Sequence, residues 1–497
     1  MIDRFRAGSD CGLATSKSLK GPAVAPQPAT PIRGGAAMSE FLFSPGATLP
    51  PLVRGKETAT AALAVKKSGK AIGRNAEGWL VPAHGSREVI DRLVVINDLS
   101  VARGGGTALA LLSVKLFRQL GVPVTYICGD DGINPELVAL GAEIVPLGGE
   151  HILTGTRGRG MATGLHNAGA KAMLEGWIAA NDTAGTVYHV HGWSKIMSPA
   201  IFAALERVSG RSILHAHDFF LACPNGAFYD YQRQSACARA PLGFGCVTCN
   251  CDKRSYVQKI WRAGRSVRLR SILLRKGASS RRVLLLHEKM APAFERSGYP
   301  PEMLHTLRNP VTPFCSERVQ VEDNSEFFFV GRLEPEKGIE DAVAAAALAG
   351  VPLTIIGEGP LKEQLSQNGK GARLLGWQSH DQIADRIRGA RALLMPTRYP
   401  EPFGLVAVEA SQSGIPVLLS DKAYLASEMV SAGIALTCDT SNATDFAKTL
   451  RQLADMSPPD IQAMSARAFS RAAQLATSPE EWRDALLDHY THLIAGA

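Results

Sequence analysis

The chain has 497 residues, of which 45% are hydrophobic and 20% are charged, and its formal net charge at pH 7 is +8. Single hydrophobic cores stop growing near about 250–300 residues, so this length predicts two domains. The positive balance favours an anionic partner such as a phosphate, a lipid headgroup or a nucleic acid. A membrane-spanning helix is excluded, because no window reaches the roughly 18 unbroken apolar residues that one needs.

Residues 1–88 are rich in Ala, Pro, Gly and Ser. We expect this leader to be disordered, because such a composition cannot offset the entropy of ordering the chain. It lacks the compact apolar core and the cleavage site of a secretory signal, so a cytoplasmic protein is expected. Met38 is an alternative start of the chain.

Residues 89–285 are predicted to form a first α/β domain. From Arg92 the pattern alternates an apolar strand, a glycine loop, a helix over 107–120 and another strand, which is typical of a parallel sheet. The predicted strands of this half are LVVINDLS (93–100), PVTYICG (123–129), TVYHVHG (186–192) and SILHAHD (212–218).

A second α/β series begins at Glu326, and residues 286–478 are assigned to a second domain. Two Rossmann-like domains in tandem predict a ligand cleft between them, because open α/β sheets bind ligands beyond the carboxyl ends of their strands. Residues 479–497 read as an amphipathic helix, which we expect to pack back on the first domain. The predicted strands of the second half are 326–333, 352–357, 372–377, 391–397, 415–420 and 433–438.

A triple glycine, Gly104 to Gly106, follows the first predicted strand and opens a helix. Backbone N–H groups and the helix dipole make such a loop an anion site. A dinucleotide fingerprint would require glycine where the chain has Leu109, although Asp130 near the end of the next strand keeps a nicotinamide site open. A tight turn without a ligand is the other alternative.

In the second half, Arg332 ends a predicted strand and Lys337 lies at the start of the following helix. Arginine can bind a phosphate through two hydrogen bonds and lysine can act as a point charge, so the two cations could bind a phosphate at the cleft edge. The alternative is a solvated loop in which both cations pair with Glu334 and Glu336.

A Pro-Phe-Gly turn follows Glu401 and leads into a helix predicted over about 405–412. The turn exposes backbone N–H groups at the first turn of that helix. Glu409 lies inside an apolar run, where a buried acid needs hydrogen-bond donors. A ribose diol would supply them, and an Arg or Lys from a neighbouring helix is the alternative.

The chain from about residue 92 to the C-terminus resembles the retaining family-4 glycosyltransferases of GT-B fold. Each matching motif is short, but they occur in the family's order over most of the chain. They are Gly104-Gly105-Gly106, VHG (190–192), HAHD (215–218), NPV (309–311), GRLEPEKG (331–338), IIGEGP (355–360) and EPFGLVAVE (401–409).

The resemblance implies transfer of a sugar from a nucleotide-diphosphate sugar to an acceptor hydroxyl, with retention of anomeric configuration. It implies that Arg332 and Lys337 hold the donor diphosphate, that Glu409 binds the ribose and that His217 lies at the donor sugar. Further residues implied to bind the donor are Glu401, Gly105, Gly106, Phe403, Gly404 and Leu405, and His191 is expected to line the acceptor side. A buried histidine bonded to backbone is the alternative for each histidine.

Glycosyl transfer needs groups that stabilise the leaving diphosphate, and it needs the anomeric carbon of the sugar to be screened from water. Two cations and a helix N-terminus can stabilise the diphosphate without a metal, and the chain has no Asp-x-Asp motif, so we expect no cofactor. A GT-B sugar-nucleotide epimerase and a non-catalytic scaffold that binds a nucleotide or glycan are the competing interpretations. The base, the sugar, the acceptor and the linkage stay open.

Five cysteines lie between Cys223 and Cys251, a segment that we expect to be an acceptor-side insertion. Cys246 and Cys249 with Cys237 and Cys223 could hold a structural zinc ion. The alternative is a set of reduced, buried thiols, since disulfides are disfavoured in a reducing cytosol.

A basic arm over residues 253–282 follows the cysteines and contains no acid. Trp261, Val267, Ile272 and Leu273 interleave with its cations, a pattern that favours binding to an anionic membrane surface and fits a glycan or lipid-linked acceptor. A solvated helix beside the acceptor cleft and a nucleic-acid patch are the alternatives, of which the last is the least favoured. The chain is therefore expected to be cytoplasmic and peripheral on the inner face of the membrane.

Overall fold

The computed structural model describes residues 72–74, 80–82, 90–102, 104–152, 157–275, 281–368 and 371–496. Most of the leader that is predicted to be disordered lies outside the described residues. Within it the structure describes two short antiparallel strands, β1 (Ile72–Arg74) and β2 (Leu80–Pro82).

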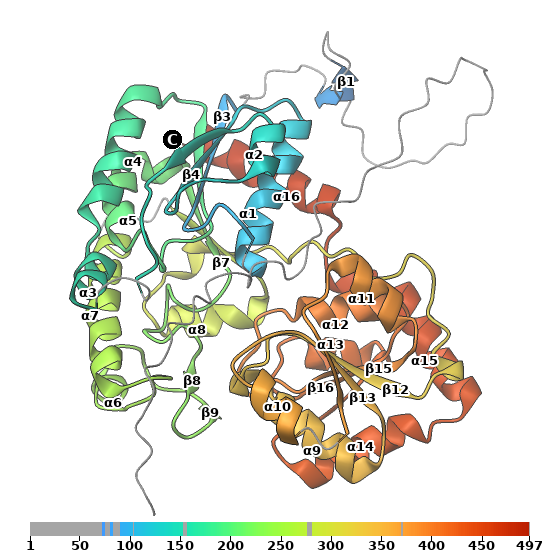
Figure 1. The fold of residues 1–497 in the computed structure, drawn as a ribbon. Coiled ribbons are helices and arrows are strands. Elements are labelled where there is room, and N and C mark those ends of the chain that lie inside the picture. The colour runs from blue at the N-terminus through green and yellow to red at the C-terminus, as the bar shows by residue number, and fades with distance from the viewer. Residues whose placement is uncertain are drawn as a thin grey trace, which may run out of the picture. The chain divides into compact units, whose positions relative to one another are not determined.

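The first half contains a seven-stranded parallel sheet in the order β11-β10-β7-β6-β3-β4-β5 (Figure 1). Its central strands are buried along their whole length, which is why they read as apolar runs without alternation. The strands are β3 (Arg92–Asn97), β4 (Val124–Cys128), β5 (Glu143–Pro146), β6 (Thr186–Val190), β7 (Ser212–Ala216), β10 (Arg282–Leu285) and β11 (Leu304–Thr306). The helices are α1 (Gly105–Gln119), α2 (Pro135–Ala139), α3 (Arg157–Leu165), α4 (Ala168–Asn181), α5 (Ala200–Ala204) and α8 (Ala291–Glu295).

The second half contains a six-stranded parallel sheet in the order β14-β13-β12-β15-β16-β17. The two parallel sheets confirm the predicted α/β class with two Rossmann-like domains. The strands are β12 (Glu326–Val330), β13 (Leu353–Ile356), β14 (Arg373–Gly376), β15 (Ala390–Met395), β16 (Val417–Ser420) and β17 (Ala435–Cys438). The helices are α9 (Ile339–Ala349), α10 (Lys362–Asn368), α11 (His380–Ile387), α12 (Leu405–Gln412), α13 (Ala426–Ser431), α14 (Ala443–Ala454) and α15 (Pro458–Arg471).

The boundary between the two sheets lies later in the chain than the predicted residue 286. Strand β11 (Leu304–Thr306) pairs in parallel with β10 and so belongs to the first sheet. The second sheet begins with β12. A three-residue strand without alternation gives too weak a pattern to be recognised in the sequence.

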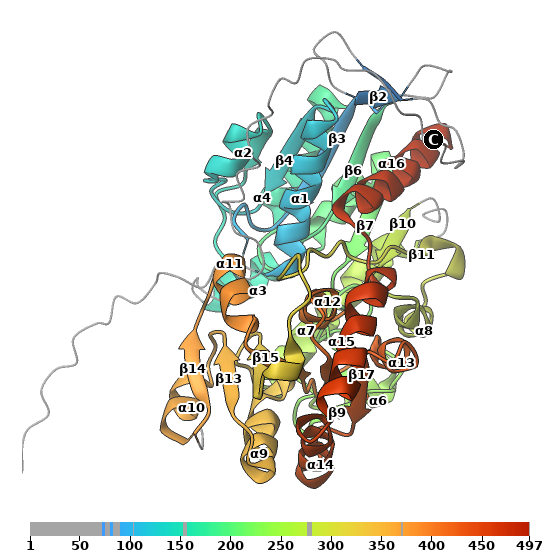
Figure 2. The same ribbon diagram turned by 90° about the vertical axis from the view of Figure 1, so that its right-hand side faces the viewer.

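The last helix, α16 (Pro479–Ala495), packs against the first sheet beside β6 and α1 (Figure 2). It begins at Ser478 with a capping box to Glu481. Trp482, Leu486 and Tyr490 recur every fourth residue on one face, and all three are fully buried in the core under that sheet. Their burial anchors the C-terminus on the first half.

The cysteine-rich insertion connects β7 to a long helix, α7 (Tyr256–Leu273). It contains the small hairpin of β8 (Tyr229–Asp230) and β9 (Ser235–Ala236) and the short helix α6 (Phe244–Val247). Among the described helices, none combines the length and the hydropathy that crossing a lipid bilayer requires.

Candidate active site

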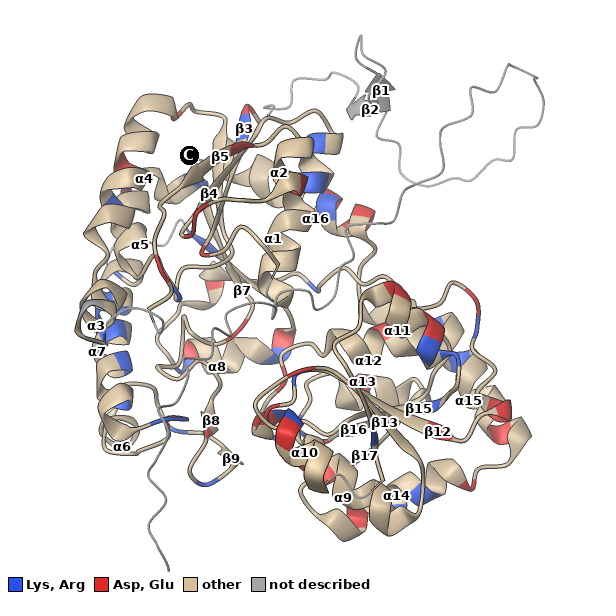
Figure 3. Ribbon diagram, viewed as in Figure 1, with Lys and Arg blue, Asp and Glu red and all other residues tan. Residues whose placement is uncertain are grey.

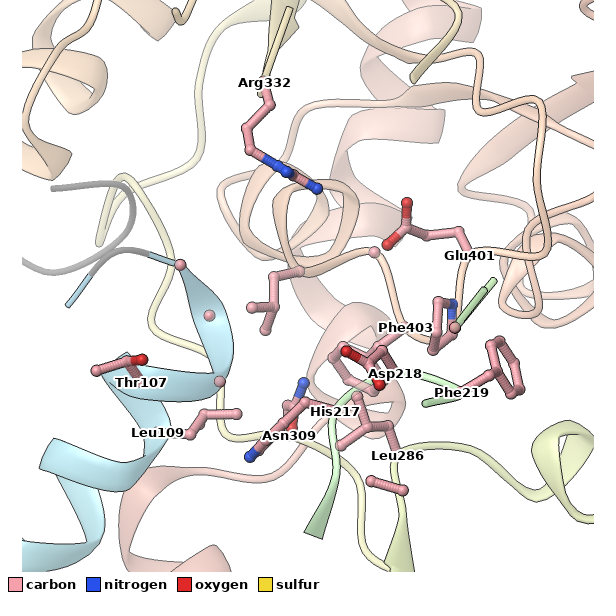
Figure 4. Close-up of a pocket in the computed structure, with 18 of the residues that line it drawn as sticks. Thr107, Leu109, His217, Asp218, Phe219, Leu286, Asn309, Arg332, Glu401 and Phe403 are labelled. Carbon is pink, nitrogen blue, oxygen red and sulfur yellow. The ribbon is translucent and has the colours of Figure 1, made fainter. Parts of the chain in front are cut away.

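A pocket of about 520 Å³ lies at the carboxyl ends of strands from both sheets. Residues that follow β3, β6 and β7 line one side of it, and residues that follow β12 and β15 line the other. Figure 4 shows Arg332 and Glu401 facing His217, Asp218 and Asn309 in this pocket. This is where ligands bind in open α/β sheets.

The triple glycine lies at the pocket and leads into α1. Gly104 has φ +146°, a conformation that side chains disfavour. A Cβ atom at Gly106 would lie 3.0 Å from Cδ2 of His217, so a side chain there would press on that ring. Glycine therefore lets the backbone at the start of α1 approach His217, and the free N–H groups of the first turn lie beside the pocket.

Lys337 and Glu401 form an ion pair in the wall of the pocket. Nζ of Lys337 donates to Oε2 of Glu401 at 2.5 Å and to the hydroxyl of Tyr399 at 2.9 Å. It also lies 5.0 Å from the centre of the Tyr399 ring. Tyr399 and Glu401 thus fix the position of the ammonium.

Arg332 lines the same pocket but is held less tightly. Its Nη1 donates to Glu334 at 3.0 Å, and its side chain is 56% exposed. The predicted alternative, in which Glu334 and Glu336 neutralise both cations, therefore holds for Arg332 but not for Lys337. Glu336 instead accepts from Lys253 at 2.8 Å.

Gly404 and Glu409 mark the start and the interior of α12. Gly404 has φ +77°, and a Cβ atom there would lie 2.9 Å from Sδ of Met395, so glycine is required before the helix. Glu409 is buried, and its Oε2 has no hydrogen-bond partner among the described residues. Burial raises the pKa of Glu409 to about 8. The other donor-binding residues predicted in this segment, Phe403 and Leu405, line the pocket, whereas Glu409 is not among its lining residues.

His191 and His217 form a stacked pair at the ends of β6 and β7. Nδ1 of His191 lies 3.0 Å from Nε2 of His217, and their ring centres are 5.1 Å apart. Burial lowers the pKa of His217 to about 3 and that of His191 well below its ordinary value. Both rings are therefore neutral at physiological pH, and each offers one N–H donor and one acceptor. The predicted alternative of a histidine bonded to backbone does not describe this pair.

Behind this pair, a chain of hydrogen bonds runs from α16 to the pocket wall. The hydroxyl of Tyr490 lies 2.6 Å from Nδ1 of His189, and Nε2 of His189 lies 3.2 Å from Nδ1 of His215. The Tyr490 hydroxyl proton has an acceptor only if it is donated to His189, because the imidazole is its one partner among the described residues. His189 then donates to His215, which leaves His215 protonated on Nε2.

Asp218, Asn309 and Tyr399 line the pocket, but the sequence analysis assigns them no role. Asp218 lies beside His217, and burial raises its pKa to about 6. Asn309 is buried, and its Oδ1 has no partner among the described residues. Asp218 and Asn309 fall inside the HAHD and NPV motifs, which could have drawn attention to them, whereas no local signal marks Tyr399.

The four cysteines predicted as zinc ligands are not brought together. Sγ of Cys249 donates to Asp230 at 3.3 Å, and Nη1 of Arg239 donates to Sγ of Cys237 at 3.5 Å. Cys246 contacts Lys259 instead, at 3.3 Å. Among the described residues, the groups of three side chains close enough to share a metal ion contain no cysteine. The eight described cysteines are free thiols.

The basic arm is not the continuous cationic surface that the sequence suggests, although Figure 3 shows basic residues along α7. Lys259, Arg265 and Arg281 are buried. Arg265 donates to the carbonyl of Ser194 at 2.8 Å and stacks over three aromatic rings. Most of the arm's described cations thus make contacts within the protein, because a helix that packs on the first domain must turn one face inward.

A segment of the second half of the chain, which forms one side of this pocket, matches a known protein family. Residues 316–473 match the family model of the glycosyl transferases group 1. This segment carries Arg332, Lys337, Glu401 and Glu409.

Sequence and structural relatives agree with that match. Glycogen synthase of Mycobacterium tuberculosis is 28% identical over 291 residues, which cover 54% of this chain and 66% of that protein, slightly less than two thirds of its length. Sucrose-phosphate synthase of Thermosynechococcus elongatus has a TM-score of 0.61 at 17% identity, over 82% of this chain and all of that one. HepE of Anabaena, solved with UDP and glucose, has a TM-score of 0.53 at 14% identity, over 81% of this chain and 99% of that one. The predicted GT-B fold is confirmed by these likenesses.

Proposed function

We propose that this chain is a retaining glycosyltransferase that moves a sugar from a nucleotide-diphosphate sugar to an acceptor hydroxyl. The observation that carries the proposal is the convergence of Arg332, Lys337 and Glu401 on one pocket, opposite the glycine-led start of α1. Two cations and free backbone N–H groups around one space fit a diphosphate. HepE, whose fold is similar, was solved in complex with UDP and glucose, and this fits a nucleotide-diphosphate sugar as the donor.

The chain's own groups can stabilise the leaving diphosphate without a metal. Lys337 is already oriented by Tyr399 and Glu401, so it needs little rearrangement as negative charge develops on the leaving oxygen. Arg332, which is half exposed, can rotate to bind a second phosphate oxygen. Glu401, released in part from Lys337, can accept from the hydroxyl groups of the sugar.

Retention follows if the acceptor hydroxyl attacks on the face from which the diphosphate leaves. The acceptor proton then passes to the departing phosphate oxygen, so no protein nucleophile is required. His191 and His217 are neutral and can hydrogen-bond the sugar or the acceptor without adding charge. An epimerase would use the same donor site but would need no acceptor.

A membrane-bound glycan acceptor fits the exposed part of α7. Val257, Ile260 and Val267 lie on one face and are 71%, 43% and 56% exposed. The exposed Arg268 lies on the same helix, the exposed Arg254 lies just before its start, and Phe244 on the adjacent α6 is 88% exposed. Apolar side chains flanked by arginines fit the surface of an anionic membrane, as expected for a cytoplasmic enzyme of polysaccharide or glycoconjugate biosynthesis.

The transferase proposal is tested with a panel of sugar nucleotides. A donor that binds raises the melting temperature by mass action, and an acceptor extract then makes the protein release nucleoside diphosphate. A panel in which no sugar nucleotide stabilises the protein would contradict the proposal. Isomerised donor in the absence of any acceptor would favour the epimerase, and binding without turnover would favour the scaffold.

The membrane proposal is tested by sedimentation with vesicles that contain anionic lipid. We expect the double variant Val257→Asp, Val267→Asp to lose binding at low salt. Leu348→Asp is the matched control, because Leu348 is 65% exposed on α9 of the second half. Equal binding of both variants and the parent protein would exclude α7 as the membrane-binding helix.

A further inference from the structure

Lys259 is a buried cation that the proposed transfer reaction does not use. Its side chain is fully buried on α7, and its Nζ contacts Sγ of Cys246 at 3.3 Å and Sγ of Cys251 at 3.2 Å. Among the described residues, no carboxylate forms an ion pair with it. Fully buried lysines normally have an acidic partner, so an amine whose contacts are two thiols is unusual.

The surroundings of this cluster are polar but contain no free acid. Asn225 donates to Sγ of Cys251 at 3.5 Å and accepts from the thiol of Cys223 at 3.1 Å. The nearby Asp252 pairs with Arg262 at 3.3 Å. The amine of Lys259 on α7 thus contacts two thiols of the insertion directly.

We propose that Lys259 and one of its two contacting thiols form a covalent cross-link when a peroxide oxidises the cluster. The contact distances of 3.2 and 3.3 Å place the nitrogen next to either sulfur before any bond forms. A peroxide molecule is small enough to reach a buried thiol when the insertion fluctuates. The site is distinct from the donor pocket and does not depend on the proposed transfer.

The reaction balances with one peroxide. The thiolate sulfur attacks one peroxide oxygen, the O–O bond breaks, and the hydroxide that leaves takes a proton from the Lys259 ammonium, which gives a sulfenic acid, water and a neutral amine. The amine nitrogen then attacks the sulfur, the S–O bond breaks, and a second water leaves. The sulfur and nitrogen lose one hydrogen each and share a bond, and the peroxide is reduced to two waters.

The cross-link would join the loop of the insertion to α7. Phe220, near the start of this insertion, lines the pocket and lies 5.5 Å from the guanidinium of Arg265 on α7. Gly226 lines the pocket as well. A bond between Lys259 and the insertion loop therefore restrains the segment that forms one wall of the pocket. Oxidation of the cluster would in this way change the mobility of that wall.

The test is peptide mass spectrometry of the full chain after treatment with hydrogen peroxide. We expect a peptide containing Lys259 joined to one containing Cys246 or Cys251, with a mass lower by two hydrogen atoms than the sum of the two. Cys249→Ala should not change this product, because its thiol lies beside Asp230 and not beside the amine. Lys259→Arg keeps a positive charge but should abolish the link.

Two results would overturn the inference. One is a disulfide between Cys246 and Cys251 in the parent protein, which would mean that the lysine is a bystander. The other is oxidation of the cluster to sulfinic acid without any link to Lys259. If Lys259→Arg does not fold, Cys251→Ala and Cys246→Ala provide the measurement, since at least one single variant retains the link and the double variant must lose it.

Discussion

Replacing Glu409 by Gln should stabilise the protein in a way that depends on pH. Glu409 is buried in α12, one of its oxygens has no partner among the described residues, and burial raises its pKa from an ordinary value of 4.5 to about 8. Between these two pH values the unfolded chain releases a proton that the folded chain keeps. Stability is therefore fully present below pH 4.5 and is lost as the pH rises toward 8.

The magnitude follows from the same pKa difference. At about 1.36 kcal/mol for each pKa unit, the loss amounts to roughly 3 kcal/mol at pH 7 and about 5 kcal/mol above pH 8. Glutamine has nearly the same shape but no proton to lose, so Glu409→Gln should remove this loss and leave the stability near pH 4.5 almost unchanged.

The assay is urea unfolding of both proteins at several pH values, followed by a signal from the second domain. We expect the curves of unfolding free energy against pH to coincide at low pH and to diverge by roughly 3 kcal/mol at neutral pH. Parallel curves would refute the reasoning, since they would mean that Glu409 is not kept protonated by burial. Loss of stabilisation by the donor in Glu409→Gln would in addition support its predicted contact with the ribose.

Three further substitutions test other parts of the site. Lys337→Met should lower kcat by about 10²–10³, because it removes an oriented charge at the leaving group, while far-ultraviolet circular dichroism stays unchanged; an active variant would contradict the role of Lys337. Tyr490→Phe should alter the tautomers of His189 and His215 in ¹⁵N NMR spectra with little change in fold, and unchanged ring signals would exclude the hydrogen-bond chain. Gly106→Ala should weaken donor binding in a thermal-shift titration, because its Cβ would press on His217. The control Gly176→Ala, at an exposed helical position, should instead stabilise the protein by about 0.5–1 kcal/mol.

The parts of the site that the sequence revealed are those formed by residues close together in the chain. The glycine loop and the turn between Glu401 and α12 could be read locally, because positive φ angles and a helix start depend on neighbouring residues. The partners of Lys337 were missed in part: Glu401 and Tyr399 lie more than 60 positions away, and only the fold brings them to the ammonium.

Contacts made across the fold could not be predicted. The bond between His189 and Tyr490 joins residues 301 positions apart, and it exists because α16 returns to the first sheet. The spacing of the cysteines suggested a metal site, but it could not show that Lys259 would occupy the space between two of the thiols. Burial of Lys259, Arg265 and Arg281 in the basic arm was hidden for the same reason, since composition does not tell which face of a helix packs inward.

The return of α16 also determines how the two halves can move. The chain passes from the first half to the second after Asn309 and comes back at Thr477, and these two passages are hydrogen-bonded to each other: Val311 N–H donates to Thr477 O at 3.0 Å and Thr477 N–H to Asn309 O at 3.2 Å. Because these two hydrogen bonds tie the crossings together, we expect a change in the orientation of the two halves to be a rotation about the crossings and not a separation at this point. Because Asn309 also lines the pocket, such a rotation would act directly on the shape of the site.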